Sequence, residues 1–275
     1  MTAIETATQI PLGETFARGL EERGQSPKAQ IVRGVVADLG DQGDVTLTIA
    51  SGFNAVTLIP EATLASAADK LRGDRQNPEA LTDFLDAYWK NFAANLVTSG
   101  RSLPLSDLQL TDCPYTSDDL SNFRDQPITE MGFYQPAVLA DKAGLPILKA
   151  GLPNMSIYVD SQGEYMNTAS GWMSVENALF TPYTNTTQKE AEDIFKRENR
   201  IGLTPNIFIA LTEVINELEG KFINVRSTSR LLGFLSQGEA ANASCYRGGN
   251  GFVLFRWHPR VRARDLGARS LGVKS

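Results

Sequence analysis

The stretch from Asn77 to Gly100 constrains the fold most, because it predicts a long helix that only a sizeable core can cover. Asn77 is a good N-cap, Pro78 suits the first helical position and Gly100 ends the pattern. Each large apolar side chain that such a helix buries contributes roughly 1.5–3 kcal/mol, so this face predicts a core element rather than a ligand site. The apolar residues at helical spacing are Leu81, Phe84, Leu85, Tyr88, Trp89, Phe92 and Leu96.

Segments with strand character lie on both sides of this helix. Residues 44–49 alternate valine, leucine and isoleucine with threonine, which is the pattern of a half-buried strand. Residues 29–37, 53–59 and 156–160 also carry β-branched or aromatic side chains. Residues 60–71 are rich in alanine and predict a second, closely packed helix. The expected fold class is therefore α+β.

The chain is expected to divide into an N-terminal sheet-and-helix part and a helical C-terminal part that ends in a β-hairpin and a basic tail. The polar stretch at residues 181–186 is the expected linker between them. The expected parts are an N-terminal arm with a short helix (1–28), an α+β body (29–180), a helical subdomain with a terminal hairpin (187–257) and the basic tail (258–275).

Three helices are predicted in the C-terminal part. Thr187 is a suitable cap for the first, and Thr204 and Gly220 bound a second with a clear apolar stripe. Residues 228–235 predict a third, shorter helix. Glycines between residues 248 and 251 favour a tight turn, and the apolar run that follows them favours a strand.

Three helices followed by a hairpin is the order of a winged-helix module, a variant of the helix-turn-helix. In such a module the third helix enters the major groove of DNA and the hairpin touches the backbone. Arg230 would then lie in the groove and Arg247 on the phosphates. The alternative is a helical subdomain packed on a sheet, because the predicted third helix leaves few polar positions for reading bases.

Charge is divided unevenly along the chain. Residues 221–275 hold ten lysines and arginines against two acidic residues, a net charge of +8. Because the whole chain carries −6, residues 1–220 carry −14. Arginine outnumbers lysine in the basic part, which favours phosphate or carboxylate partners. The predicted contact residues are Arg230, Arg247, Arg256, Arg260, Arg262, Arg264 and Arg269.

Several kinds of catalytic and metal site are excluded by residue type. Cys113 and Cys245 lie far apart, which argues against a structural zinc site and a disulfide framework. His258 is the only histidine and is surrounded by arginines, which makes it a poor general base. There is no Gly-x-Ser-x-Gly, Walker A or Gly-x-Gly-x-x-Gly sequence. We therefore expect no cofactor and no metal, and a protein that is not an enzyme.

Residues 107–125 hold five aspartates, and this is where a divalent ion would first be sought. A solvated acidic loop that receives the basic tail is the simpler interpretation. Acidic residues are abundant elsewhere too, so a carboxylate-dependent hydrolase stays open as an alternative function.

The pattern favours a structural subunit of a larger assembly, viral or nucleoprotein in kind, that contacts other copies of itself, other subunits or nucleic acid through its basic end. No apolar run approaches the length of a membrane span, and the expected location is the cytoplasm or a virion assembled there. Truncation after Pro259 is expected to abolish assembly and leave a folded body.

Overall fold

The computed structural model has an α+β architecture in which helices and three β-sheets alternate along the chain, which confirms the predicted class. The predicted strand at residues 29–37 and the arm at residues 1–28 lie outside the described residues. The structure describes residues 45–47, 56–58, 61–101, 103–152, 156–158, 163–245 and 251–273.

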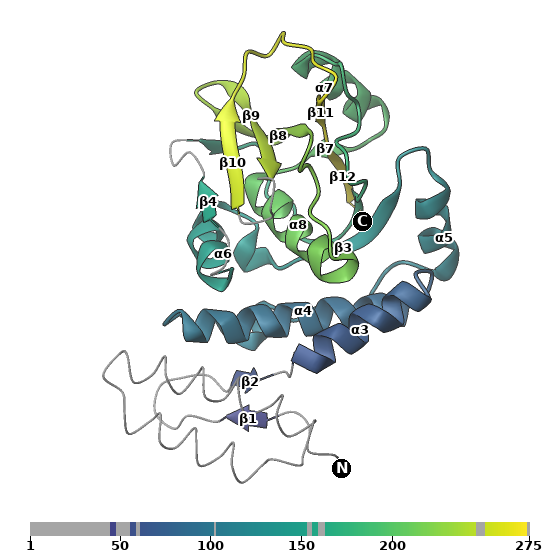
Figure 1. Cartoon of the computed structure of the whole chain (residues 1–275), viewed down its shortest axis with the longest axis vertical. Helices are drawn as coiled ribbons and strands as arrows, with labels where there is room; N and C mark the ends of the chain where they lie inside the picture. The colour runs from purple at the N-terminus through teal and green to yellow at the C-terminus, as the bar shows by residue number, and fades with distance from the viewer. Residues whose placement is uncertain are drawn as a thin grey trace.

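Two helices, α3 (Glu61–Gly73) and α4 (Pro78–Thr98), lie side by side beneath the two larger sheets (Figure 1). Asn77 caps α4 as predicted, accepting hydrogen bonds from the backbone N–H groups of Glu79 and Ala80. Both predicted helices are therefore confirmed.

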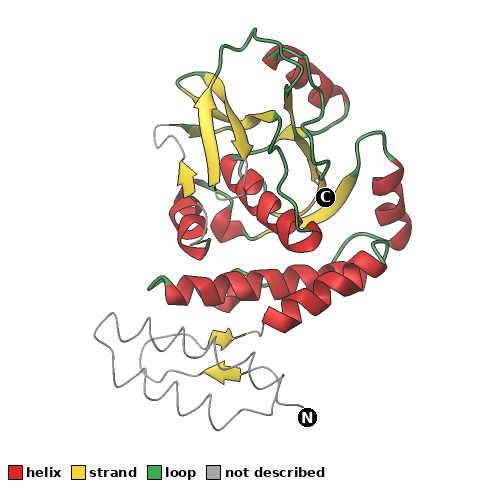
Figure 2. Ribbon diagram, in the orientation of Figure 1, coloured by secondary structure: helices red, strands yellow, loops and turns green. Residues whose placement is uncertain are grey.

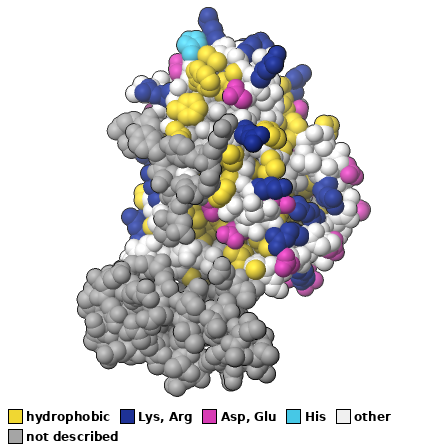
Figure 3. Space-filling view, in the orientation of Figure 1, with side chains coloured by type: hydrophobic (Ala, Val, Ile, Leu, Met, Phe, Trp, Pro, Cys, Tyr) yellow, Lys and Arg dark blue, Asp and Glu magenta, His cyan; other side chains and the backbone are white. Residues whose placement is uncertain are grey.

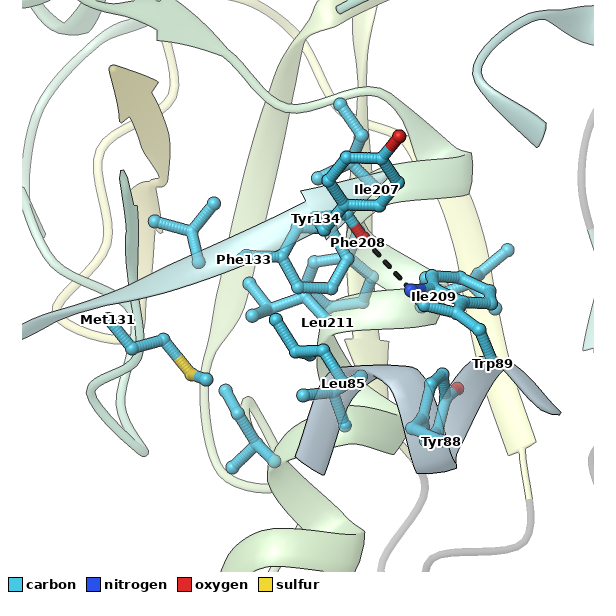
Figure 4. Close-up of a cluster of buried hydrophobic side chains, with 14 of the residues drawn as sticks. Leu85, Tyr88, Trp89, Met131, Phe133, Tyr134, Ile207, Phe208, Ile209 and Leu211 are labelled. Atoms are coloured by element: carbon cyan, nitrogen blue, oxygen red, sulfur yellow. Dashed lines mark hydrogen bonds between the residues drawn. The ribbon is translucent and has the colours of Figure 1, made fainter. Parts of the chain in front are cut away.

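The main core lies where α4 meets the strand β3 (Glu130–Gln135) and the helix α8 (Pro205–Glu219) (Figure 4). Trp89 is 1% exposed, and its indole Nε1 donates to the carbonyl oxygen of Tyr134 at 3.2 Å. Phe133 of β3 and Phe208 of α8 are buried in the same cluster. The aromatic face of the long helix is thus core, as its spacing predicts.

A four-stranded antiparallel sheet joins β3 to strands from much later in the chain. Its order is β3, β6 (Gly171–Glu176), β12 (Ser270–Val273) and β7 (Ile201–Gly202). The C-terminal strand β12 therefore lies between strands that come from both sides of the predicted linker at residues 181–186.

A six-stranded mixed sheet forms the upper half of the molecule (Figure 2). Neighbours run β11-β8-β9-β10-β4, β5 pairs with β8, and the β11–β8 and β10–β4 pairs are parallel. β9 and β10 pair antiparallel, and the residues between them lie outside the described ranges. The strands are β4 (Ser156–Tyr158), β5 (Glu164–Tyr165), β8 (Thr228–Ser236), β9 (Glu239–Cys245), β10 (Gly251–Arg256) and β11 (Leu266–Ala268).

The remaining elements are short, apart from α7, whose predicted cap Thr187 is confirmed by a capping box with Glu190. A two-stranded antiparallel sheet precedes α3. These elements are β1 (Val45–Leu47), β2 (Val56–Leu58), η1 (Leu105–Asp107), α5 (Ser117–Asp125), η2 (Ala137–Leu139), η3 (Lys142–Gly144), α6 (Leu145–Gly151) and α7 (Gln188–Arg197).

The predicted third helix at residues 228–235 is wrong, because this segment is the strand β8. β8 is paired on both edges and largely buried, so its apolar residues follow one another without alternation. A short continuous apolar run of this kind does not distinguish a strand from a buried helix. Gly233, inside this segment, is the residue that could have indicated a strand, because glycine in a strand often marks a close approach of neighbouring backbone. A Cβ atom there would lie 2.5 Å from the carbonyl oxygen of Gly202. The order of elements is therefore not that of a winged helix.

The predicted basic tail at residues 258–275 is also wrong in its last part. Leu266–Ala268 and Ser270–Val273 are the strands β11 and β12, and Leu271 is fully buried. Removing everything after Pro259 would take core strands out of both larger sheets. The expectation that a truncated body stays folded therefore no longer holds.

Gly267 lies where β11 crosses the segment that leads to α7. A Cβ atom at this position would lie 2.0 Å from the carbonyl oxygen of Pro182. Since backbone must shift to make room, we expect Gly267→Ala to lower the free energy of unfolding by about 1–3 kcal/mol, measured by urea denaturation. Gly73→Ala is the matched control, because a Cβ atom there meets nothing within 4 Å. Equal stability of the two variants would contradict the prediction.

Candidate functional site: the arginine loop

The segment that joins β10 to β11 carries most of the predicted contact residues. We define the arginine loop as residues 256–264, which run over the top of the molecule as seen in Figure 1. Arg256, Arg260, Arg262 and Arg264 are all exposed. The structure therefore brings four of the seven predicted arginines together on one accessible segment.

Arg230 is hydrogen-bonded to the backbone of this loop. Its side chain belongs to β8 and is buried, with 2% of the residue exposed. Its guanidinium donates to the carbonyl oxygen of Val261 at 2.5 Å and to that of Thr186 at 2.7 Å. Burial lowers the pKa of Arg230. The expectation that Arg230 reads bases is wrong, because its donors are already bound to the backbone of its own chain.

Arg262 ties the loop to the start of α7. Its guanidinium forms an ion pair with Glu190 and donates to the carbonyl oxygen of Asn185 at 3.2 Å. Hydrogen bonds from the backbone and side chain of Thr187, followed by Arg262, lower the pKa of Glu190. Both groups of the ion pair are about half exposed, so it orients the loop more than it stabilises the fold.

Backbone hydrogen bonds hold the loop at further points. The N–H of Gln188 donates to the carbonyl oxygen of Pro259 at 2.9 Å, and the N–H of Val261 donates to that of His258 at 3.0 Å. The N–H of Thr228 donates to the carbonyl oxygen of Asp265 at 2.7 Å. The loop is thus fixed to α7 and β8 before any partner binds.

An exposed tryptophan begins the loop. Trp257 is 39% exposed, and its ring lies beside that of Phe255 with 6.0 Å between the centroids. The guanidinium groups of Arg256, Arg260 and Arg264 make no ion pair or hydrogen bond within the described residues, and the backbone N–H of Arg260 donates to Nδ1 of His258 at 3.2 Å. Sequence reasoning overlooked Trp257, although an aromatic pair next to arginines in residues 255–260 is a recognisable signal. Figure 3 shows basic and hydrophobic side chains together over this end of the molecule.

Arg269 lies far from the loop's exposed face. It is 0% exposed, and its guanidinium donates to the carbonyl oxygens of Glu176, Ala178 and Phe180 and to Oδ1 of Asn224. Burial lowers the pKa of Arg269 to about 10. The expectation that Arg269 binds a partner is wrong, since no part of its side chain reaches the surface. Arg247 lies outside the described residues.

A second buried polar network crosses the four-stranded sheet. Arg200 forms an ion pair with Glu130 at 2.7 Å and donates to Oγ of Ser270 at 2.6 Å. The carboxylate of Glu176 accepts from the N–H and hydroxyl groups of Ser270. Burial raises the pKa of Glu176 in spite of these bonds. Each carboxylate is engaged in joining strands, so the network is structural.

A cavity of about 300 Å³ lies beside β3 and α5. Its lining includes Glu130, which is already paired with Arg200, and Asp125 and Arg124 at the rim. No group of three or more histidine, cysteine, aspartate or glutamate side chains with metal-binding geometry occurs within the described residues.

None of the described helices has both the length and the apolar character needed to cross a bilayer.

The aspartates of residues 107–125 form an acidic surface around α5. Asp107, Asp112, Asp118 and Asp125 are exposed. Asp119 is used locally, because it completes a capping box with Thr116. In Figure 1, α5 lies at the right-hand edge near the end of α3, and the arginine loop lies at the top of the molecule. Acidic side chains also lie beside the loop, because Glu190 of α7 pairs with Arg262.

Comparison with protein-family models, with curated proteins and with solved structures found no match to this chain. The function of the arginine loop must therefore be argued from its own residues.

Proposed function

We propose that the protein is a non-enzymatic subunit of a larger assembly, viral or nucleoprotein in kind, which contacts an anionic partner through the arginine loop. The observation that carries the proposal is a fixed loop with three unpaired, exposed guanidinium groups, those of Arg256, Arg260 and Arg264. Arginine suits this role because its planar donors match carboxylates and phosphates.

Self-association is the form of assembly favoured by two distinct exposed surfaces, one with aspartates and one with unpaired arginines. Exposed aspartates lie in α5 and in the segment before it, and the unpaired arginines lie on the loop at the top of the molecule in Figure 1. A contact between unlike surfaces of two copies is heterologous, and repetition of such a contact builds rings or filaments. The interaction is electrostatic and lies at the surface, so added salt weakens it.

Two other functions receive less support. The winged-helix hypothesis is not supported, because the segment that would have to be the DNA-reading helix is the strand β8. The hydrolase hypothesis lacks a pair of free carboxylates facing each other in the described cavity, where Glu130 is bound to Arg200.

Charge reversal at the loop tests the proposal. We expect the wild-type protein to show a larger mass at low than at high salt by light scattering, and the combined variant Arg256→Glu, Arg260→Glu, Arg264→Glu to be monomeric at both. The control reverses three exposed basic residues away from the loop, Arg101, Lys142 and Lys149, and changes net charge equally. Unchanged assembly in the loop variant, or equal loss in both variants, would contradict a role for the loop.

A further inference from the structure

The arginine loop presents an aromatic surface as well as positive charge. Trp257 and Phe255 lie on the same side of the end of β10, with ring planes inclined at 55°. Single exposed apolar side chains are common on protein surfaces. Trp257 differs from such cases because it follows Arg256 in the sequence and lies three residues before Arg260, on a segment where both arginines are exposed.

Exposed arginines next to an exposed tryptophan are typical of proteins that bind single-stranded nucleic acid. Proteins that bind single-stranded nucleic acid combine basic groups along the backbone path with aromatic side chains on which unpaired bases stack. An acidic protein surface would neutralise the arginines but would make no specific use of an indole ring. A duplex keeps its bases stacked on one another, so Trp257 would be unused there too.

The net negative charge of the whole molecule also favours a single strand over a duplex as the ligand. Only three guanidinium groups of the loop are unpaired, and the chain carries a net charge of −6. The dense phosphates of a duplex would approach an acidic body along with the loop. A flexible single strand can follow a short basic segment and avoid the acidic surface around α5. Proteins that bind nucleic acid through charge alone usually have a broad basic surface.

Preorganisation strengthens the argument. Arg230 holds the loop backbone at Val261, and Arg262 joins it to Glu190 of α7. Side chains on a fixed loop lose less conformational entropy on binding than those on a mobile one. Two of the arginines predicted to touch a partner therefore act by positioning the others.

We propose that the arginine loop binds single-stranded nucleic acid, with Trp257 stacking on an unpaired base and Arg256, Arg260 and Arg264 contacting phosphates. This inference rests on the proposed function, because it assigns a second anionic ligand to the exposed arginines that are proposed to mediate assembly.

Intrinsic fluorescence gives a direct test. Trp89 and Trp172 are 1% and 5% exposed, so Trp257 is the tryptophan that a ligand can reach. We expect an unlabelled oligo(dT) to quench the fluorescence of nuclease-treated wild-type protein. It should leave that of Trp257→Phe unchanged. Quenching that persists in Trp257→Phe would overturn the assignment of the stacking residue.

Affinity is measured by fluorescence anisotropy with a labelled oligo(dT) and with a duplex of the same length. We expect Trp257→Ala to weaken binding of the single strand roughly tenfold or more, and Trp257→Phe to retain most of it, because stacking needs an aromatic ring. With three phosphates neutralised, the logarithm of the binding constant should fall with that of the salt concentration with a slope of about −2. Equal affinity for the duplex, or no effect of Trp257→Ala, would overturn the inference.

Light scattering separates the two proposals. Trp257→Ala keeps every arginine, so its salt-dependent assembly should match that of the wild type even if nucleic-acid binding is lost. If oligo(dT) does not bind but the triple arginine variant fails to assemble, the inference fails and the proposed function stands. If the triple variant behaves as the wild type in both assays, both proposals fail.

Discussion

Replacement of Arg269 by methionine should destabilise the protein by at least about 3 kcal/mol, because each buried acceptor that loses its hydrogen bond costs about 1–3 kcal/mol. The guanidinium of Arg269 binds the carbonyl oxygens of Glu176, Ala178 and Phe180. Methionine fills much of the same space but donates no hydrogen bond, so these buried acceptors lose their partners. Since folded domains are stable by only about 5–15 kcal/mol, we expect partial unfolding at physiological temperature.

Urea denaturation measures this loss, and Arg264→Met is the matched control because Arg264 is exposed and makes no ion pair within the described residues. We expect the control to change the free energy of unfolding by less than about 0.5 kcal/mol. The two substitutions remove the same charge, so only the environment of the side chain separates them. Similar, small effects at both positions would show that the Arg269 network contributes little.

The helices were predictable because their ends are marked by residue type. Asn77 and Thr204 cap α4 and α8, each with proline at the next position, and both caps are confirmed. Gly220 ends α8 in a left-handed conformation with φ of 64°, which glycine adopts without strain. Such signals are local, so they do not depend on what the rest of the chain does.

Some strands of the C-terminal part were hard to predict because several of their partners are distant in sequence. β8 is a helix candidate by its apolar run alone. It forms a hairpin with β9, joined by Gln237 and Gly238 at positive φ, and also pairs with the distant strands β5 and β11. Similarly, β12 pairs with β6, about a hundred residues earlier. None of these distant pairings leaves a mark on the local sequence that periodicity can detect.

The same limit applies to the candidate site. Counting arginines located the basic end, but the count does not distinguish Arg269, which is buried, from Arg264, which is exposed. The decisive difference is the set of backbone carbonyls that the fold brings around Arg269. Trp257 was within reach of sequence reasoning, since it lies next to Arg256 and close to Arg260, but its exposure was not.

A carboxyl group on α8 should make stability depend on pH. Burial, followed by the nearby charge of Glu217, raises the pKa of Glu213 to about 7. Oε1 of Glu213 is buried without a hydrogen-bond partner within the described residues. The hydroxyl of Tyr88 and the thiol of Cys245 face the same region, and burial, followed by the charge of Glu213, raises the pKa of each. No group among these three neighbours stabilises a negative charge on Glu213.

The direction of the effect follows from where the proton is bound. Between the ordinary pKa of a glutamate and about 7, the folded protein keeps a proton on Glu213 that the unfolded chain has released. Stability therefore falls as pH rises through this window, and above pH 7 the folded state contains a carboxylate with one oxygen buried and without a hydrogen bond among the described residues. Glu213→Gln keeps the shape of the side chain and removes the charge.

We expect Glu213→Gln to be more stable than the wild type above pH 7, by an amount on the order of 3 kcal/mol, since the pKa of Glu213 is raised from 4.5 to about 7 and one pKa unit corresponds to about 1.4 kcal/mol. Below the ordinary pKa of glutamate the two proteins should have nearly equal stability, because Glu213 is then protonated in both states. Urea denaturation at a series of pH values measures the difference, with Glu164→Gln as a control at an exposed carboxylate. A stability difference that does not change with pH would show that Glu213 is not held in its protonated form by the fold.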